Sequence, residues 1–230
     1  MFEIKMNLET IWLRMANACE AAGREAASVR LLAVSKTFPA QAVVQAHAAG
    51  QSDFGENYIQ EGVDKIQALA HLPLVWHCIG PIQSNKTRLV AENFDWVHSV
   101  DRLKIAQRLS EQRPPTRQPL QVCIQVNVDG GPTKAGVSPE QAAALARQIS
   151  GLPGLRLRGI MSIPEPAPDF ASALAVHQRS LALYEALKAQ GFDLDTLSLG
   201  MSADLEAAIQ AGSTLVRVGS AIFGTRSSQA

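Results

Sequence analysis

Long apolar runs, an excess of one charge and a cysteine framework are all missing from this 230-residue chain. No segment approaches the roughly 18 uncharged apolar residues of a membrane-spanning helix, and the N-terminus lacks the basic and apolar regions of a signal peptide. The formal net charge is +0, so nothing favours a nucleic-acid or membrane surface as a partner. With 47% hydrophobic and 18% charged residues, the composition is that of a globular protein.

The cysteines are few and scattered. Cys19, Cys78 and Cys123 lie far apart and show no C-x-x-C spacing. An odd number of distant thiols predicts neither a disulfide framework nor a structural metal site. We expect them to be small core residues in a reducing compartment, which makes the cytoplasm the expected location.

Short apolar strands alternate with helical segments along the chain. The expected strands are Leu31–Lys36, Ser52–Asn57, Trp76–Gly80, Trp96–Val100, Leu120–Val128, Leu155–Ile163, Leu197–Ser202 and Leu215–Gly219. The expected helices between them are Pro39–Ala49, Glu56–Leu69, Asn85–Asn93, Asp101–Gln112, Pro139–Ser150, Pro168–Gln190 and Ala203–Ala211. This order predicts an α/β fold with one domain over residues 1–230, a closed parallel (β/α)8 TIM barrel. An open doubly wound sheet is the alternative, but no Gly-x-Gly-x-x-Gly follows the first strand.

An extra helix is expected before the first strand. Its apolar residues fall on one face, and Gly23 is placed to end it: Leu8, Ile11, Trp12, Met15, Ala18, Cys19 and Ala22. The fifth strand alternates between an apolar and a more polar set. We expect its apolar set to face the helices and the other set, Gln121, Cys123, Gln125 and Asn127, to face the lumen.

Lys36 ends the buried run Leu31–Ser35, where the chain turns through Thr37, Phe38 and Pro39. An ammonium group at the end of an apolar strand is costly unless something uses it. Loss of hydration favours the neutral amine, which is the form that condenses with a carbonyl. The alternative is a lysine that extends from the strand end into solvent.

The last strand runs into a small-residue turn and a short apolar helix start over residues 216–224. Such a turn presents backbone N–H groups to an anion, and barrels often hold phosphate after strands seven and eight. Ser202, Gly219 and Ser220 lie at these places, although Ser202 could instead cap the following helix. Together with Lys36 they predict one ligand, a phosphorylated aldehyde, for which pyridoxal 5′-phosphate (PLP) is the obvious candidate.

Arg217 is expected to point into the lumen from the last strand. No acidic residue lies near it in sequence, so a distant carboxylate or a ligand must pair with it. If it meets the pyridine nitrogen of PLP it can only donate, because a guanidinium group does not release its proton. The ring nitrogen then stays unprotonated, which makes the ring a poor electron sink.

The chain resembles the pyridoxal phosphate homeostasis proteins, small PLP-binding barrels related to the N-terminal domain of alanine racemase. The resemblance covers essentially the whole chain and rests on these stretches: Leu32-Ala33-Val34-Ser35-Lys36-Thr37, Phe54-Gly55-Glu56-Asn57-Tyr58, Trp76-His77-Cys78-Ile79-Gly80, Gln83-Ser84-Asn85-Lys86, Arg158-Gly159-Ile160-Met161, Leu199-Gly200-Met201-Ser202 and Val216-Arg217-Val218-Gly219-Ser220-Ala221-Ile222-Phe223-Gly224.

The resemblance implies roles for particular residues. Lys36 would hold PLP as a Schiff base, and Arg217 would face its ring nitrogen. Asn57 would lie beside the cofactor. The phosphate contacts implied are those of Ser202, Gly219 and Ser220.

Two stretches depart from the family pattern. The family usually has Gly-His-Leu-Gln after strand three, whereas this chain has Gly80-Pro81-Ile82-Gln83, which puts any role of that histidine in doubt. The loop after strand five is also unlike the family's, although Lys134 keeps its place. Lys134 is either a second aldehyde or phosphate contact or a solvated loop lysine.

The histidines show no spacing typical of a metal site. His47, His71 and His177 fall on helices or helix ends, where we expect them at the surface. His77 and His98 fall within strands.

Three hypotheses follow. The first is a PLP carrier without turnover, which stores the cofactor or delivers it to apo PLP-dependent enzymes. The second is an amino-acid racemase, but related racemases take a second base from an added domain of a partner chain. This chain ends soon after its last strand, and of its tyrosines only Tyr58 is near the expected site. The third, a Schiff-base aldolase or sugar-phosphate barrel, explains Lys36 but not Arg217. We favour the carrier, expected to be a monomer.

Overall fold

The predicted alternation of strands and helices folds into one closed barrel. The computed structural model describes residues 2–131 and 135–224, and within them eight parallel strands pair in chain order, with the last closing on the first. The strands are β1 (Arg30–Val34), β2 (Asp53–Glu56), β3 (Val75–Cys78), β4 (Trp96–Val100), β5 (Leu120–Gln125), β6 (Leu155–Met161), β7 (Thr196–Ser198) and β8 (Leu215–Val218). The TIM-barrel prediction is confirmed.

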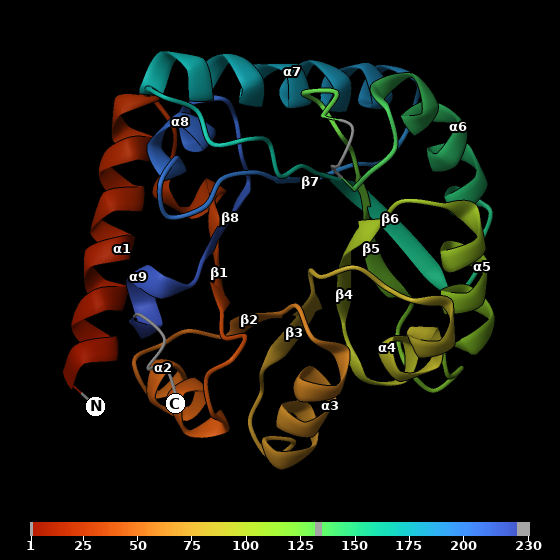
Figure 1. Cartoon of the computed structure of the whole chain (residues 1–230), viewed down its shortest axis with the longest axis horizontal. Helices are drawn as coiled ribbons and strands as arrows, with labels where there is room; N and C mark the ends of the chain where they lie inside the picture. Colours follow the sequence, from red (N-terminus) through yellow and green to blue (C-terminus); the bar gives the residue numbers. More distant parts are fainter. Residues whose placement is uncertain (1, 132–134, 225–230) are drawn as a thin grey trace.

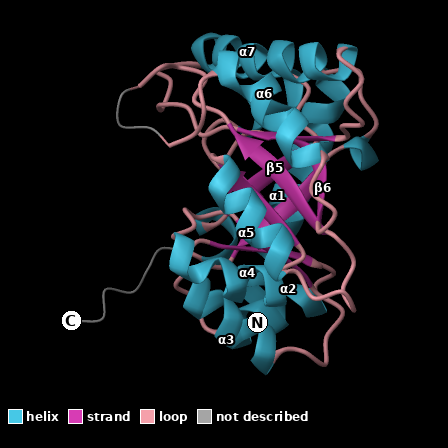
Figure 2. Cartoon of the chain, turned by 90° about the vertical axis from the view of Figure 1, so that its right-hand side faces the viewer, coloured by secondary structure: helices cyan, strands magenta, loops and turns pink. Residues whose placement is uncertain are grey.

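The helices form a ring around these strands (Figure 1), and a side view shows the strands inside this helical layer (Figure 2). Their bounds are α1 (Phe2–Ala21), α2 (Ala40–Ala48), α3 (Ile59–Ala68), α4 (Thr87–Asn93), α5 (Leu103–Gln112), α6 (Pro139–Ser150), α7 (Phe170–Ala189), α8 (Leu205–Gln210) and α9 (Ser220–Phe223). Two short 3-10 turns, Ala26–Ser28 and Ser84–Lys86, complete the described elements. None of the helices in these residues combines the length and hydropathy needed to cross a membrane.

The extra N-terminal helix is present as α1, which packs on its own barrel against α2, α8 and α9 (Figure 1). Its apolar stripe is buried there, with Leu8 and Ile11 almost fully covered. Gly23 follows the helix with φ 65°, a left-handed conformation that glycine adopts without strain, and so marks the predicted end.

The lumen and the outer core divide as the alternation on β5 predicted. Leu120, Val122 and Ile124 belong to the large core between strands and helices. Cys123 packs with Trp96 and Met161 in a separate small cluster inside the barrel. The three cysteines are free and buried, as expected of small core residues.

Barrel closure brings the two ends of the chain together. β1 pairs with β8, with Leu32 opposite Arg217 and Ala33 opposite Val218. Because parallel strands end at the same rim, the turn at Lys36 lies beside the turn at Gly219. Several predicted strands end earlier than expected, so Lys36, Asn57 and Ser202 lie in loops at this rim.

Candidate functional site

A cavity of about 440 Å³ opens at the carboxyl ends of β1 and β8. Its lining joins both predicted halves of the site: Val34, Lys36, Thr37, Phe38, Gly219, Ser220 and Gly224. The active sites of barrel enzymes lie at this end of the strands. The cavity thus unites Lys36, Gly219 and Ser220, whereas Asn57, Ser202 and Arg217 are not part of its lining.

Lys36 follows β1 and is half-buried. It lies two residues beyond Val34, on the same side of the chain, and both line the cavity. Within the described residues its amine has no hydrogen bond or ion pair. The group is therefore available to a ligand.

The turn into α9 provides N–H groups for an anion. Gly219 accepts hydrogen bonds from Ile222 and Phe223, while the N–H groups of Ser220 and Ala221 have no backbone acceptor within the described chain. A Cβ on Gly219 would lie 3.2 Å from the carbonyl oxygen of Val34, so a larger residue would crowd the strand that leads to Lys36. The turn can therefore approach a ligand through its backbone.

Ser202 lies in the turn after β7 and is half-buried. The alternative that it caps the next helix is wrong, because α8 begins at Leu205 and Asp204 is its N-cap residue. Asp204 instead accepts a hydrogen bond of 2.7 Å from the N–H of Met201 and stabilises the turn. No contact of the Ser202 hydroxyl is found in the described part of the chain, which leaves it available.

Arg217 is 4% exposed and points into the lumen. Its Nη1 donates to the carbonyl and the hydroxyl oxygen of Ser198, at 2.7 Å each, and its Nη2 donates to the carbonyl of Ser162 at 2.9 Å. The alternative of an ion pair with a barrel carboxylate is not found among the described residues. Burial lowers the pKa of Arg217 to about 10, so the group stays cationic at neutral pH.

Asn57 comes directly after β2. Its side-chain oxygen is buried and has no hydrogen-bond partner in the described structure. A buried acceptor without a donor is uncommon in native proteins and points to a group that binds there. This fits the predicted place of Asn57 beside a ligand.

A polar cluster behind Lys36 was missed by the sequence analysis. Lys65 on α3 is only 6% exposed, and its Nζ donates to the Ser35 carbonyl at 2.8 Å, to Glu56 at 2.7 Å and to Glu61 at 2.6 Å. Burial raises the pKa of Glu56, although the nearby Lys65 charge acts against this shift. The four-residue spacing of Glu61 and Lys65 on a helix was the available signal.

A second polar chain runs along the lumen below Arg217. The Ser198 hydroxyl lies 3.0 Å from Nδ1 of His98, His98 lies 2.9 Å from Nδ1 of His77, and His77 lies 3.0 Å from Asp53. Burial lowers the pKa of both histidines, that of His98 well below its usual value. Neutral imidazoles satisfy the chain if Arg217 donates to Ser198 and each group donates onward to the ionised Asp53.

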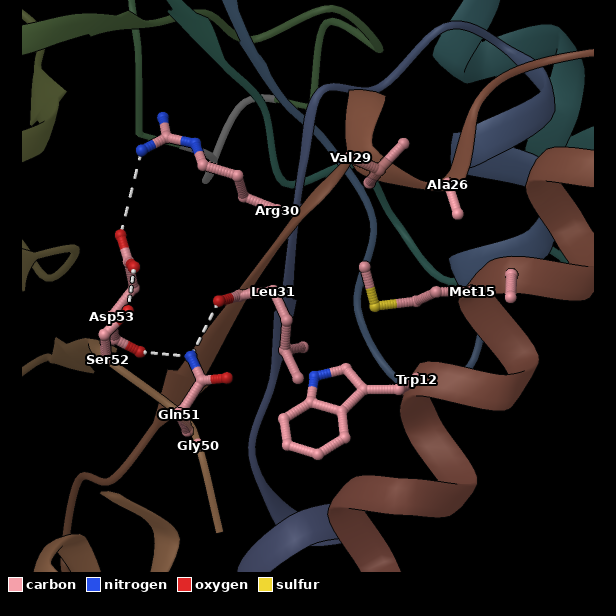
Figure 3. Close-up of a pocket in the computed structure, with 11 residues that line it drawn as sticks. Trp12, Met15, Ala26, Val29, Arg30, Leu31, Gly50, Gln51, Ser52 and Asp53 are labelled. Carbon is pink, nitrogen blue, oxygen red and sulfur yellow. Dashed lines mark hydrogen bonds and ion pairs between the residues drawn. The ribbon is translucent and has the colours of Figure 1, made fainter. Parts of the chain in front are cut away.

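The opposite end of the barrel has its own cavity, of about 350 Å³ (Figure 3). Its lining includes Trp12, Met15, Arg30, Gln51 and Asp53. The Gln51 amide donates to the carbonyls of Leu31 and Asp53, at 2.8 Å each, so this polar group is already paired. We therefore place the functional site at the other end.

His177 was expected at the surface but is fully buried, because Asp204 accepts a hydrogen bond of 2.8 Å from its Nε2. Sequence position on α7 gave no sign of this partner on another element. Lys134, the other candidate lysine, lies outside the described residues.

Comparison with known proteins identifies relatives over nearly the whole chain. The family described as alanine racemase, N-terminal domain, matches residues 9–227. A protein of Pseudomonas aeruginosa named pyridoxal phosphate homeostasis protein is 58% identical over 98% of this chain and 97% of its own. A Vibrio cholerae protein of the same name is 55% identical over 98% of each chain.

Solved structures share this fold over nearly the whole chain. PipY of Synechococcus elongatus, solved with PLP bound, superposes with a TM-score of 0.83 at 36% identity and covers 96% of this chain and 100% of its own. An alanine racemase of Clostridium difficile superposes with a TM-score of 0.76, and the match spans 100% of this chain and 58% of that one. At 15% identity this last likeness shows the fold alone.

Proposed function

This chain belongs to the pyridoxal phosphate homeostasis protein family, and from this premise we propose that it binds PLP as a Schiff base on Lys36 and buffers or delivers it. The observation that carries the proposal is the shared cavity, where an amine without a protein partner faces an anion-binding turn. The PLP-bound relative supports the identity of the ligand.

The residues present fit this cofactor. The aldehyde of PLP supplies the carbonyl carbon that a primary amine attacks. Lys36 offers that amine, and the free N–H groups after Gly219, with the Ser220 and Ser202 hydroxyls, would hold the phosphate. The unpaired oxygen of Asn57 is left for a donor on the ligand.

Arg217 favours binding over turnover. The Ser198 and Ser162 oxygens hold its guanidinium group in the lumen, where it can only donate a hydrogen bond. An arginine that faces the ring nitrogen keeps that nitrogen unprotonated and weakens the ring as an electron sink. We therefore propose a carrier rather than an amino-acid racemase, with apo PLP-dependent enzymes as recipients. We further propose that it acts as a monomer in the cytoplasm.

Hydride trapping tests the attachment point. PLP is mixed with the protein, borohydride reduces the adduct, and peptide mass spectrometry locates it. We expect the adduct on Lys36, its loss in Lys36→Ala, and its retention in Lys104→Ala, which removes an exposed lysine on α5. An adduct on another side chain, or none, would overturn the proposal.

Two further measurements separate carrier from racemase. Transfer of PLP to an apo-enzyme in the presence of a trap for free aldehyde should still activate that enzyme if delivery is direct. Amino acids incubated with the loaded protein in deuterated water should keep their α-hydrogen. Rapid deuterium incorporation would favour the racemase instead.

A further inference from the structure

Lys36 lies between two residues whose backbone is held from outside the lumen. The carbonyl of Ser35 accepts a hydrogen bond of 2.8 Å from Nζ of Lys65. The N–H of Thr37 donates a hydrogen bond of 2.6 Å to Oε1 of Glu61. Lys65 therefore binds the backbone one residue before Lys36, and Glu61 binds it one residue after.

The side chain of Lys65 is fully paired in this arrangement, whereas Oε2 of Glu56 is buried without a partner in the described residues. Lys65 has three N–H donors, and all three are used by Ser35, Glu56 and Glu61. Glu56 is fully buried and also accepts a hydrogen bond of 2.6 Å from the Ser35 hydroxyl. Movement of Lys65 would leave the Ser35 carbonyl and the buried Glu56 without this donor, which favours a fixed position of the cluster.

Thr37 shows that the backbone at this point needs support. Its φ is 67°, and it is the sole non-glycine residue with positive φ in the described ranges 2–131 and 135–224. For a β-branched residue this conformation is a genuine outlier. Strained backbone of this kind persists where the surroundings hold it, and it is common at functional sites.

We propose that Glu61 and Lys65 are positioning residues that fix the turn after β1, so that the Lys36 amine is directed at the ligand's carbonyl carbon. Neither residue lines the cavity, so both act through the backbone rather than on the ligand. The inference rests on the proposed function for the identity of the ligand.

Two ligands that differ only at the reacting carbon test this inference. PLP carries an aldehyde, whereas pyridoxine 5′-phosphate has the same ring and phosphate with an alcohol instead. In Glu61→Ala the turn is free to relax, and we expect the Kd for PLP to rise about tenfold while the Kd for pyridoxine 5′-phosphate is unchanged. The matched control is Asp64→Ala, an exposed acidic residue on the same helix, which should change neither Kd.

A second variant tests the backbone directly. Glycine adopts positive φ readily, so Thr37→Gly added to Glu61→Ala should recover part of the lost PLP affinity. Glu61→Gln keeps an oxygen acceptor for the Thr37 N–H and should stay within about threefold of the unmodified protein. Glu61→Gln remains informative if Glu61→Ala folds poorly, because weakened PLP binding in a variant that keeps the acceptor would contradict the positioning role.

The outcomes separate the two proposals. If the unmodified protein forms the Lys36 adduct but Glu61→Ala binds PLP as Asp64→Ala does, the positioning role is overturned and the proposed function stands. Equal weakening of both ligands by Glu61→Ala also overturns it, because the damage would then be general. If the unmodified protein forms no adduct on Lys36, the proposed function fails, and the positioning role with it.

Discussion

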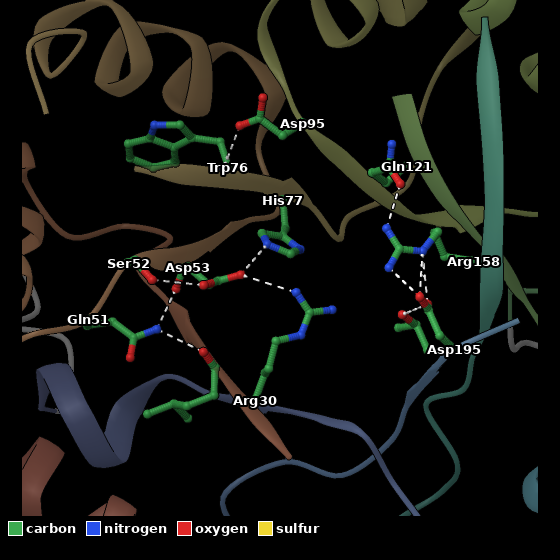
Figure 4. A network of polar contacts seen from close by, with 12 residues as sticks. Arg30, Gln51, Ser52, Asp53, Trp76, His77, Asp95, Gln121, Arg158 and Asp195 are labelled. Carbon is green, nitrogen blue, oxygen red and sulfur yellow. Dashed lines mark hydrogen bonds and ion pairs between the residues drawn. The ribbon is translucent and has the colours of Figure 1, made fainter. Parts of the chain in front are cut away.

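The two ends of the barrel lumen differ in how their polar groups are paired. At the amino end of the strands, Arg30 lies 3.7 Å from Asp53, and Arg158 donates to Asp195 at 2.9 Å (Figure 4). Both guanidinium groups also lie over the Trp96 ring, at 5.0 and 4.8 Å from its centroid. The charged groups of this end are therefore paired with one another and packed against Trp96.

The carboxyl end is the opposite. There the Lys36 amine and the Ser202 hydroxyl have no partner in the described residues, and the buried oxygen of Asn57 has none either. Unpaired polar groups and a strained Thr37 would only weaken the fold unless a ligand uses them. The comparison indicates that one end of the lumen stabilises the barrel and the other serves binding.

The largest effect on stability should come from removing the Trp96 side chain at the amino end of the lumen. Trp96 is 5% exposed, and Trp96→Ala leaves a large cavity between Arg30 and Arg158. We expect a loss of about 3–5 kcal/mol in the free energy of unfolding, measured by urea titration. Tyr58→Ala, an exposed aromatic at the other end, should change it by less than about 0.5 kcal/mol. Equal losses of unfolding free energy in the two variants would show that the two ends of the lumen do not differ in their contribution to stability.

The histidines of the lumen predict a dependence on pH. In the unfolded chain an imidazole takes up a proton near pH 6.5, whereas burial lowers the folded-state pKa of His77 and His98. The charges of Arg217 and Arg30 further oppose a proton on His98. Because the unfolded chain then binds more protons, the free energy of unfolding falls as the pH falls through this window.

The size of this loss follows from linkage. Between pH 7.5 and 5.5 each such histidine should remove at most about 1.4 kcal/mol, the value reached when its folded-state pKa lies well below this range, as measured by urea titration at each pH. His98→Gln should remove the larger part of the dependence, while His71→Gln, an exposed control, should leave it intact. A pH-independent free energy of unfolding would show that burial does not keep these imidazoles neutral.

Sequence alone predicted the scaffold because its signals are local. Strand and helix alternation identified every strand, and the alternation on β5 identified the lumen side. Strand ends were placed too late, as at Lys36, which lies in the turn after β1 ends at Val34. The polar groups of the binding end were predicted mostly from chain position and family resemblance.

The buried polar pairs could not be predicted from the sequence, because they depend on contacts between distant elements. Lys65 looks like an ordinary charged helix residue until Glu56 at the end of β2 is placed against it. His177 was assigned to the surface because its partner Asp204 lies on another element. Buried charge becomes visible only when the partners have been brought together in space.

Ser198 and Ser202, which lie close together in the sequence, offer the smallest but most specific test of the difference between paired and unpaired polar groups in the lumen. The Ser198 hydroxyl accepts from Arg217 at 2.7 Å and lies 3.0 Å from His98, so Ser198→Ala leaves Nδ1 of His98 without this partner and removes one of the two acceptors of Arg217 Nη1. We expect it to lower the free energy of unfolding by about 1–2 kcal/mol. Ser202→Ala removes a hydroxyl without a described partner and should leave stability within about 0.5 kcal/mol, while the Kd for PLP rises about fivefold.

Measuring both quantities in both variants makes this pair decisive. Three residues lie between the two serines, and the substitution is the same, so a difference in the size of the removed group does not enter. A stability loss in Ser202→Ala without loss of PLP affinity would mean that its hydroxyl serves the fold. In that case the phosphate would depend on the α9 turn alone, and the functional end of the lumen would be smaller than the comparison implies.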